Sequence, residues 1–311
     1  MKNFKIIAAI LFVLFIFLEL FVFMRDDVKT SDKPIVSVST FVLYDAVRAI
    51  AGDSVVLKNI LPFGVDPHSF ELTPKTMASI ERSALVIYSG AGLEPWIDKI
   101  VFQTKVLNMS QFVNLRKIGK IEQEKHHHKH HSEEGEAIDP HYWLDFENMK
   151  IVAKKITEAL IEILPENAKD FTLRRDLYLK SIDKLEKDYE KKLAACSVHH
   201  LILNHNSFGY LADKYNFHAE SLTGLSPEAS PSPSDIKRIL QEIKKDGVET
   251  IFYEHFVNAR VIESIAKDAN IKIEVIQTLG NITAKQANKQ VTYEELMQEN
   301  LKKIAEAMYC K

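Results

Sequence analysis

PIVSVSTFVLYDAVRAIAGDSVVLKNIL, residues 34–61, runs from an apolar segment at 34–42, predicted to be a strand, through an amphipathic stretch at 43–52 into a second apolar segment at 54–61. The same rhythm continues through an amphipathic stretch at 73–83 and an apolar run at 84–90. Alternation of this kind is typical of a parallel sheet with helices on its faces. The first part of the chain, residues 26–164, is therefore predicted to form an α/β lobe.

Two long helical patterns follow, at residues 147–164 and 165–195, and Pro165 separates them. Proline suits the first turn of a helix, because its fixed φ is helical and its missing N–H would have no helical partner. A helix over 165–195 would be about 45 Å long at about 1.5 Å per residue. One lobe does not need that length, so the helix is predicted to link two lobes.

The strand–helix rhythm then resumes over residues 196–311. Strands are predicted at 199–206, 217–222, 248–255 and 271–279, with helices at 209–215, 232–247, 259–270 and 292–308. The predicted fold class is α/β, with two similar lobes, each a parallel sheet flanked by helices, joined by one long rigid helix. The length of 311 residues suits two such domains.

Composition and the N-terminal residues limit the possible partners and the cellular compartment of the protein. The formal charge of −3 and the lack of a basic stripe argue against nucleic acid. Lys2 and Lys5 precede an apolar run at 6–24, which is typical of an export segment. Residues 1–25 are expected to be a signal peptide or an uncleaved membrane anchor. The anchor is slightly favoured, since no A-x-A-like cleavage site is visible and about 20 apolar residues can span a bilayer. Either way, the chain is expected in the periplasm or another extracytoplasmic space.

The chain has two cysteines, Cys196 and Cys310. In an oxidising compartment such a pair could form a disulfide between the C-terminal helix and its own lobe, while two free thiols remain the alternative. Neither cysteine has metal-ligand spacing.

Three isolated histidines lie where a ligand site of an open α/β sheet is expected, near the carboxyl ends of strands. The triplet DPH occurs at 66–68 and again at 139–141, and His205 ends a predicted strand in LILNHN. Proline stiffens each triplet, and Asp66 or Asp139 could accept the second ring N–H of its histidine. One triplet alone would more often be a turn. Two of them with His205 favour metal ligands.

Residues 125–136 hold a separate histidine-rich run of mixed charge without periodicity. It is predicted to be a surface loop with weak, variable metal affinity and not the ordered site. Its histidines are His126, His127, His128, His130 and His131.

Several motifs together closely resemble the metal-carrying substrate-binding proteins of ABC importers for zinc and manganese. They are GVDPHSFELTPKTMASIERSALVIYSGAGLEPWIDKI, the histidine-rich loop, DPHYWLDFENMKIVAKKITEAL, NHNSFGYLADKY and GLSPEASPSPSDIKRILQEIKKDGVETIFYE. The resemblance covers nearly all of the chain after the N-terminal segment. It implies an ion in the cleft between the lobes, held by His68 and His141 from the first and His205 from the second. It also implies a monomer that delivers its ion to a membrane permease driven by an ATPase.

The fourth ligand is where this sequence departs from the family. Family members often have aspartate at the position of Gln277, so the remaining donor is expected to be water or a carboxylate such as Glu71 or Glu254. Three imidazoles without an obvious acid favour Zn²⁺ over Mn²⁺ or iron. The predicted function is high-affinity zinc capture for an importer, with affinity falling at low pH and little hinge motion.

Two other classes of function compete with this prediction. Three histidines with an open position also suit a zinc-dependent hydrolase. The chain has neither an HExxH helix nor a Gly-x-Ser-x-Gly motif, so it is not expected to be an enzyme. The other alternative, a surface adhesin, is supported only by the predicted membrane anchor.

Overall fold

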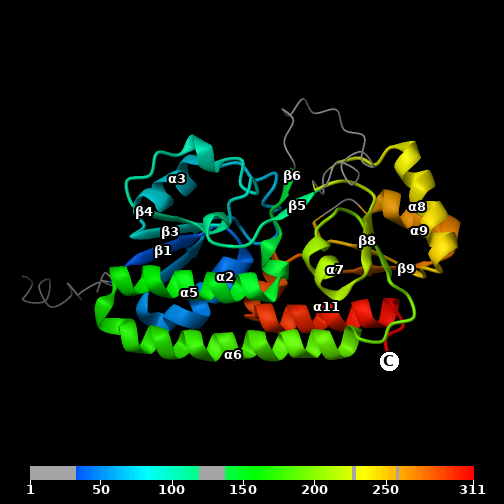
Figure 1. Ribbon diagram of the computed structural model, residues 1–311. Coiled ribbons are helices and arrows are strands. Elements are labelled where there is room, and N and C mark those ends of the chain that lie inside the picture. The colour runs from blue at the N-terminus through cyan, green and yellow to red at the C-terminus, as the bar shows by residue number, and fades with distance from the viewer. Residues whose placement is uncertain (1–32, 119–136, 226–228, 257–258) are drawn as a thin grey trace, which may run out of the picture. The chain divides into compact units, whose positions relative to one another are not determined.

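The computed structural model describes residues 33–118, 137–225, 229–256 and 259–311. Four parallel strands form its first sheet: β1 (Ile35–Val38), β2 (Val56–Asn59), β3 (Leu85–Tyr88) and β4 (Lys105–Asn108), in the order β2-β1-β3-β4 (Figure 1). Helix α2 (Phe41–Ala51) follows β1 directly. The strand predicted at 34–42 was therefore too long. Residues 41–43 are helical and buried. In the sequence, a short apolar run looks the same in a buried helical turn and in a strand.

The second sheet has the same construction. Its parallel strands are β7 (His200–Leu203), β8 (His218–Ser221), β9 (Thr250–Tyr253) and β10 (Lys272–Val275), in the order β10-β9-β7-β8. The predicted α/β class, with two parallel sheets flanked by helices, is confirmed.

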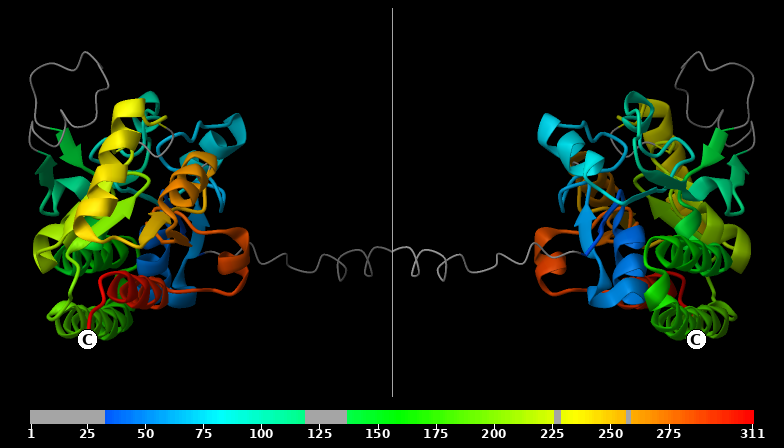
Figure 2. Two further views of the ribbon diagram at one scale, coloured as in Figure 1. Left: turned by 90° about the vertical axis from the view of Figure 1, so that its right-hand side faces the viewer. Right: turned by 90° about the vertical axis from the view of Figure 1, so that its left-hand side faces the viewer.

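The helices cover both sheets and run between them. In addition to α2 they are α3 (Pro74–Glu81), α5 (Phe146–Ile163), α6 (Ala168–Leu193), α7 (Gly209–Tyr215), α8 (Pro233–Asp246), α9 (Arg260–Ala269), α10 (Ala284–Asn288) and α11 (Tyr293–Ala307). Figures 1 and 2 show α5, α6 and α11 side by side along one side of the two sheets. The predicted long helix is present, and Pro165–Asn167 forms a 3₁₀ turn at its start.

Helix α6 contributes side chains to one hydrophobic core that the two halves share. Its buried face includes Phe171 near its start and Tyr189 near its end, at the three- and four-residue spacing of an amphipathic helix. Both belong to a single cluster of buried side chains with Val36 of β1 and Leu201 of β7. Burying one large apolar side chain contributes roughly 1.5–3 kcal/mol. The helix packs against α2 and α5 of the first half and against α11 of the second, and residues 34–311 form one compact unit.

A two-stranded hairpin, β5 (Arg116–Ile118) and β6 (Ala137–Asp139), was not predicted. It is antiparallel, with Arg116 opposite Asp139. The predicted N-terminal segment 1–25 and the histidine-rich run 125–136 both lie outside the described residues. Among the residues that are described, no helix has the length and apolar character needed to cross a membrane.

The second half is closed by a covalent link near the chain's end. Cys196, just after α6, and Cys310, just after α11, form a disulfide. Backbone hydrogen bonds from Ser197 and Val198 to the carbonyl of Met308, at 3.1 and 3.0 Å, lie beside it. The disulfide therefore joins the end of the long helix to the last helix.

Candidate metal site

Each DPH triplet is a short, stiff turn that presents its histidine. In the loop after β2, the Asp66 carboxylate accepts the backbone N–H of His68 at 2.8 Å. At the end of β6, Asp139 Oδ1 accepts the backbone N–H of His141 at 3.0 Å and contacts its Nδ1 at 2.9 Å. Aspartate favours such turns because its side chain can bond the backbone two residues on. Asp139 also sets the ring of His141, which leaves Nε2 for a ligand.

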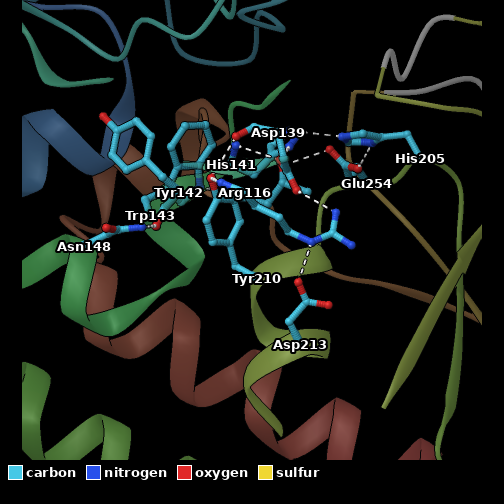
Figure 3. A network of polar contacts seen from close by, with 11 residues as sticks. Arg116, Asp139, His141, Tyr142, Trp143, Asn148, His205, Tyr210, Asp213 and Glu254 are labelled. Carbon is cyan, nitrogen blue, oxygen red and sulfur yellow. Dashed lines mark hydrogen bonds and ion pairs between the residues drawn. The ribbon is translucent and has the colours of Figure 1, made fainter. Parts of the chain in front are cut away.

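His205 is oriented by a different carboxylate. It lies just beyond β7, and its Nδ1 pairs with Oε1 of Glu254, which follows β9. The second oxygen of Glu254 accepts a hydrogen bond from the Thr278 hydroxyl at 2.8 Å. Glu254 therefore acts on His205 as Asp139 acts on His141, and it directs Nε2 of His205 away from itself (Figure 3).

The three histidines converge on one point. One side-chain nitrogen from each of His68, His141 and His205 lies within 4.8 Å of the others, and no other such group occurs in the described part of the chain. Nε2 of His205 is 3.3 Å from Nε2 of His141. Two nitrogens about 2.0–2.1 Å from one tetrahedral zinc ion would be about 3.4 Å apart. The spacing of this pair therefore fits a shared metal ion.

Burial and charge give the rings different proton affinities. Burial, followed by the neighbouring rings of His141 and His205, holds the pKa of His68 well below its ordinary value. Burial also opposes charge on His205, but the carboxylates of Glu254, Asp66 and Asp139 together outweigh it, so the pKa of His205 is raised. The lowered pKa keeps the His68 ring neutral and able to bind a cation, while at His205 a proton competes more strongly with a cation.

The cavity beside the histidines is small. Its volume is about 10 Å³, which is about the space for one water molecule. Asp66 and Glu254 are among its lining residues, while neither Glu71 nor Gln277 is among the described residues that line it. Glu71 is exposed, and the backbone of Gln277 is held by the side chain of Asn300. The structure thus does not place Glu71 or Gln277 as a fourth donor.

Sequence reasoning missed two residues that line the cavity, Trp143 and Asn281. Trp143 packs edge-on against His141, with ring centroids 5.5 Å apart, and its indole N–H donates to the Thr278 carbonyl at 2.6 Å. Asn281 donates to the carbonyls of Pro62 and Val65 at 2.8 and 2.7 Å, which ties the loop after β10 to the His68 loop. The only local signal for Trp143 was its place two residues after His141.

Comparison with known proteins finds a matching family and several similar proteins. A family described as zinc-uptake complex component A, periplasmic, matches residues 36–307. The chain is 27% identical over 285 residues to the high-affinity zinc uptake system protein ZnuA of Bacillus subtilis, covering 90% of this chain and 89% of that protein. It is 28% identical over 281 residues to the zinc-binding protein AdcA of Streptococcus pyogenes, covering 86% of this chain and 55% of AdcA. The chain thus spans about half the length of these AdcA relatives.

Solved structures share the fold. The periplasmic zinc binding protein TroA of Treponema pallidum matches with a TM-score of 0.75 at 24% identity, covering 89% of this chain and 99% of TroA. The laminin binding protein Lmb of Streptococcus agalactiae matches with a TM-score of 0.78 at 24% identity, covering 88% and 99%. At these identities the likeness establishes the architecture.

Proposed function

The chain belongs to the zinc-uptake complex component A family, and from this premise we propose that it captures Zn²⁺ and delivers it to an ABC-type importer. His68, His141 and His205 are the proposed ligands, and a water molecule completes the tetrahedron. The observation that carries the proposal is the convergence of three histidine nitrogens within 4.8 Å. His68 follows a strand of the first sheet, His141 follows the β5–β6 hairpin and His205 follows a strand of the second sheet, so the ion would be taken up between the two halves.

The donor set favours zinc as the cargo. Zinc accepts imidazole nitrogen readily, whereas manganese prefers oxygen ligands. The carboxylates of Asp139 and Glu254 each contact the Nδ1 side of a histidine. This arrangement supports three neutral nitrogen donors over a carboxylate-rich site. It also argues against a hydrolase, because Glu254 is engaged by His205 and Thr278 and is poorly placed to serve as a general base.

Delivery is proposed to need a membrane permease and a cytoplasmic ATPase. The carrier is proposed to act as a monomer outside the cytoplasm, with residues 1–25 as its export signal or membrane tether. Its proposed parts are a first lobe at 26–164, the linking helix at 165–195 and a second lobe at 196–311. Because α6 packs against α2 and α5 of the first half and against α11 of the second, large hinge motion is not expected on loading.

The test is a competition titration of metal-stripped protein with zinc and manganese against a chromophoric chelator. The variants are His205→Ala, deletion of residues 125–136, and His255→Ala, which changes an exposed histidine as the control. One tight zinc site should survive the deletion and the control and be lost in His205→Ala. If tight binding instead leaves with residues 125–136 and ignores His205, the proposed site is wrong.

A further inference from the structure

Arg116 lies beside the site without touching the histidines. It begins β5, directly opposite Asp139 in the hairpin. Its Nε donates to Asp213 of α7 at 2.7 Å, and its Nη1 is 3.6 Å from Oδ2 of Asp139. Figure 3 shows the guanidinium between these two carboxylates. Arg116 thus connects a helix of the second half to the residue that orients His141.

Helix α7 is fitted to this arginine at two further points. The Tyr210 hydroxyl accepts the backbone N–H of Arg116 at 2.8 Å and donates to the carbonyl of Asp139 at 2.9 Å. Gly209, the first residue of α7, lies against the guanidinium, where a Cβ atom would be 2.5 Å from Nη1. The side chain of Arg116 is only 15% exposed. The joint between hairpin and helix is therefore tight.

Asp139 needs the charge that Arg116 supplies. Its side chain is fully buried, and Oδ1 serves both the backbone and the ring of His141. Within the described residues Oδ2 accepts no hydrogen bond, and it faces the guanidinium. A buried carboxylate without a compensating positive charge is costly. Without Arg116, the carboxylate would be expected to turn or take up water, and its hold on the imidazole would weaken.

We propose that Arg116 is a positioning residue of the metal site. Its guanidinium holds the Asp139 carboxylate in place, and Asp139 in turn aims Nε2 of His141 at the ion. Because Tyr210 and Asp213 belong to α7, the orientation of His141 in the first half depends on how α7 of the second half packs against the hairpin. The inference rests on the proposed zinc-binding function and extends it to a residue outside the ligand set.

Four variants of the full-length protein test the inference by zinc competition titration. Arg116→Met removes the charge, while Gly209→Ala pushes the flexible end of the arginine aside and keeps it. Arg116→Lys restores a cation. Arg48→Met is the matched control, because Arg48 pairs with the buried Asp45 and neither residue lines the site.

Loss of an outer partner of a metal ligand typically costs about 10–100-fold in affinity. We expect a loss of about tenfold or more for Arg116→Met, a smaller loss for Gly209→Ala, partial recovery in Arg116→Lys and no change in Arg48→Met. The d–d absorption spectrum of the cobalt-loaded protein should also change in Arg116→Met and not in the control. A merely structural role would leave that spectrum unchanged.

A double-mutant cycle isolates the route through Asp139. If Arg116 acts through that carboxylate, Arg116→Met should cost nothing further in an Asp139→Asn background. If zinc affinity and the cobalt spectrum stay unchanged in both Arg116→Met and Gly209→Ala, the role of Arg116 is refuted while the proposed zinc-binding function stands. Additive losses in the double-mutant cycle would refute the role of Arg116 in the same way. If the wild-type protein has no zinc site that His205→Ala removes, the proposed function fails and this inference fails with it.

Discussion

Replacing Glu254 with glutamine tests the electrostatics of the site with almost no change of shape. Glu254 is 5% exposed and bonds His205 Nδ1 with one oxygen and the Thr278 hydroxyl with the other. A glutamine can keep both contacts, with its carbonyl toward His205 and its amide toward Thr278. The substitution therefore removes charge and little else. The imidazole becomes a weaker donor, and we expect zinc affinity at pH 8 to fall about 10–100-fold, or about 1.4–2.7 kcal/mol.

The pH dependence should change in the opposite sense. In the wild-type protein Glu254 raises the pKa of His205 against the effect of burial, so a proton competes with zinc below that raised pKa. Protonation of His205 stabilises the metal-free fold at low pH, and this stability is lost as the pH rises through the raised pKa. Glutamine removes the largest of the contributions that raise the pKa of His205, while those of Asp66 and Asp139 remain. Competition by protons should then begin at lower pH, and the difference in affinity should shrink as the pH falls from 8 toward 5.5.

The assay is a chelator competition titration at several pH values. Glu71→Gln is the matched control, since Glu71 is exposed and does not line the cavity. Its affinity should equal that of the wild type at every pH. Wild-type affinity in Glu254→Gln at pH 8, or an affinity ratio that stays constant with pH, would refute the orienting role given to Glu254.

Three further outcomes follow from the same contacts. Zinc at 100 times its dissociation constant should stabilise the wild-type protein by about 2.7 kcal/mol in urea unfolding; the same gain in His205→Ala would contradict the ligand assignment. Cys196→Ser opens a link between residues 114 apart in sequence, which should cost up to about 5 kcal/mol of unfolding free energy while zinc affinity is kept; unchanged stability under oxidising conditions would show that the disulfide does not contribute. Tyr293→Phe removes the hydroxyl that donates to the buried carbonyl of Trp143 at 2.7 Å, and it should cost about 1–3 kcal/mol by chemical denaturation; a loss below 0.5 kcal/mol would mean that the carbonyl finds another donor.

Much of the architecture could be predicted because it depends on local pattern. The alternation of apolar strands with amphipathic helices indicated both parallel sheets, and the spacing of buried residues along α6 indicated a helix long enough to serve both. The hairpin of β5 and β6 was missed. Its strands are three residues each and far apart in sequence, too short to show a period.

The residues of the candidate site could likewise be predicted only in part. The two DPH triplets and the position of His205 after an apolar strand pointed to His68, His141 and His205, because stiff turns at strand ends are local features of sequence. The sequence left the remaining donor open between a water molecule and a carboxylate such as Glu71 or Glu254. Only the fold separated them, by burying Glu254 against His205 and leaving Glu71 exposed.

The sequence by itself thus determined the class of fold and the histidines of the candidate site, because both depend on local periodicity and on the residues that form turns. Tertiary structure alone decided that Glu254 orients His205 and that Arg116, held by Asp213 of α7, compensates Asp139. Those pairings join residues from 23 to 97 positions apart in sequence. The energy of a buried charge depends on what surrounds it in space, and no local pattern carries that information.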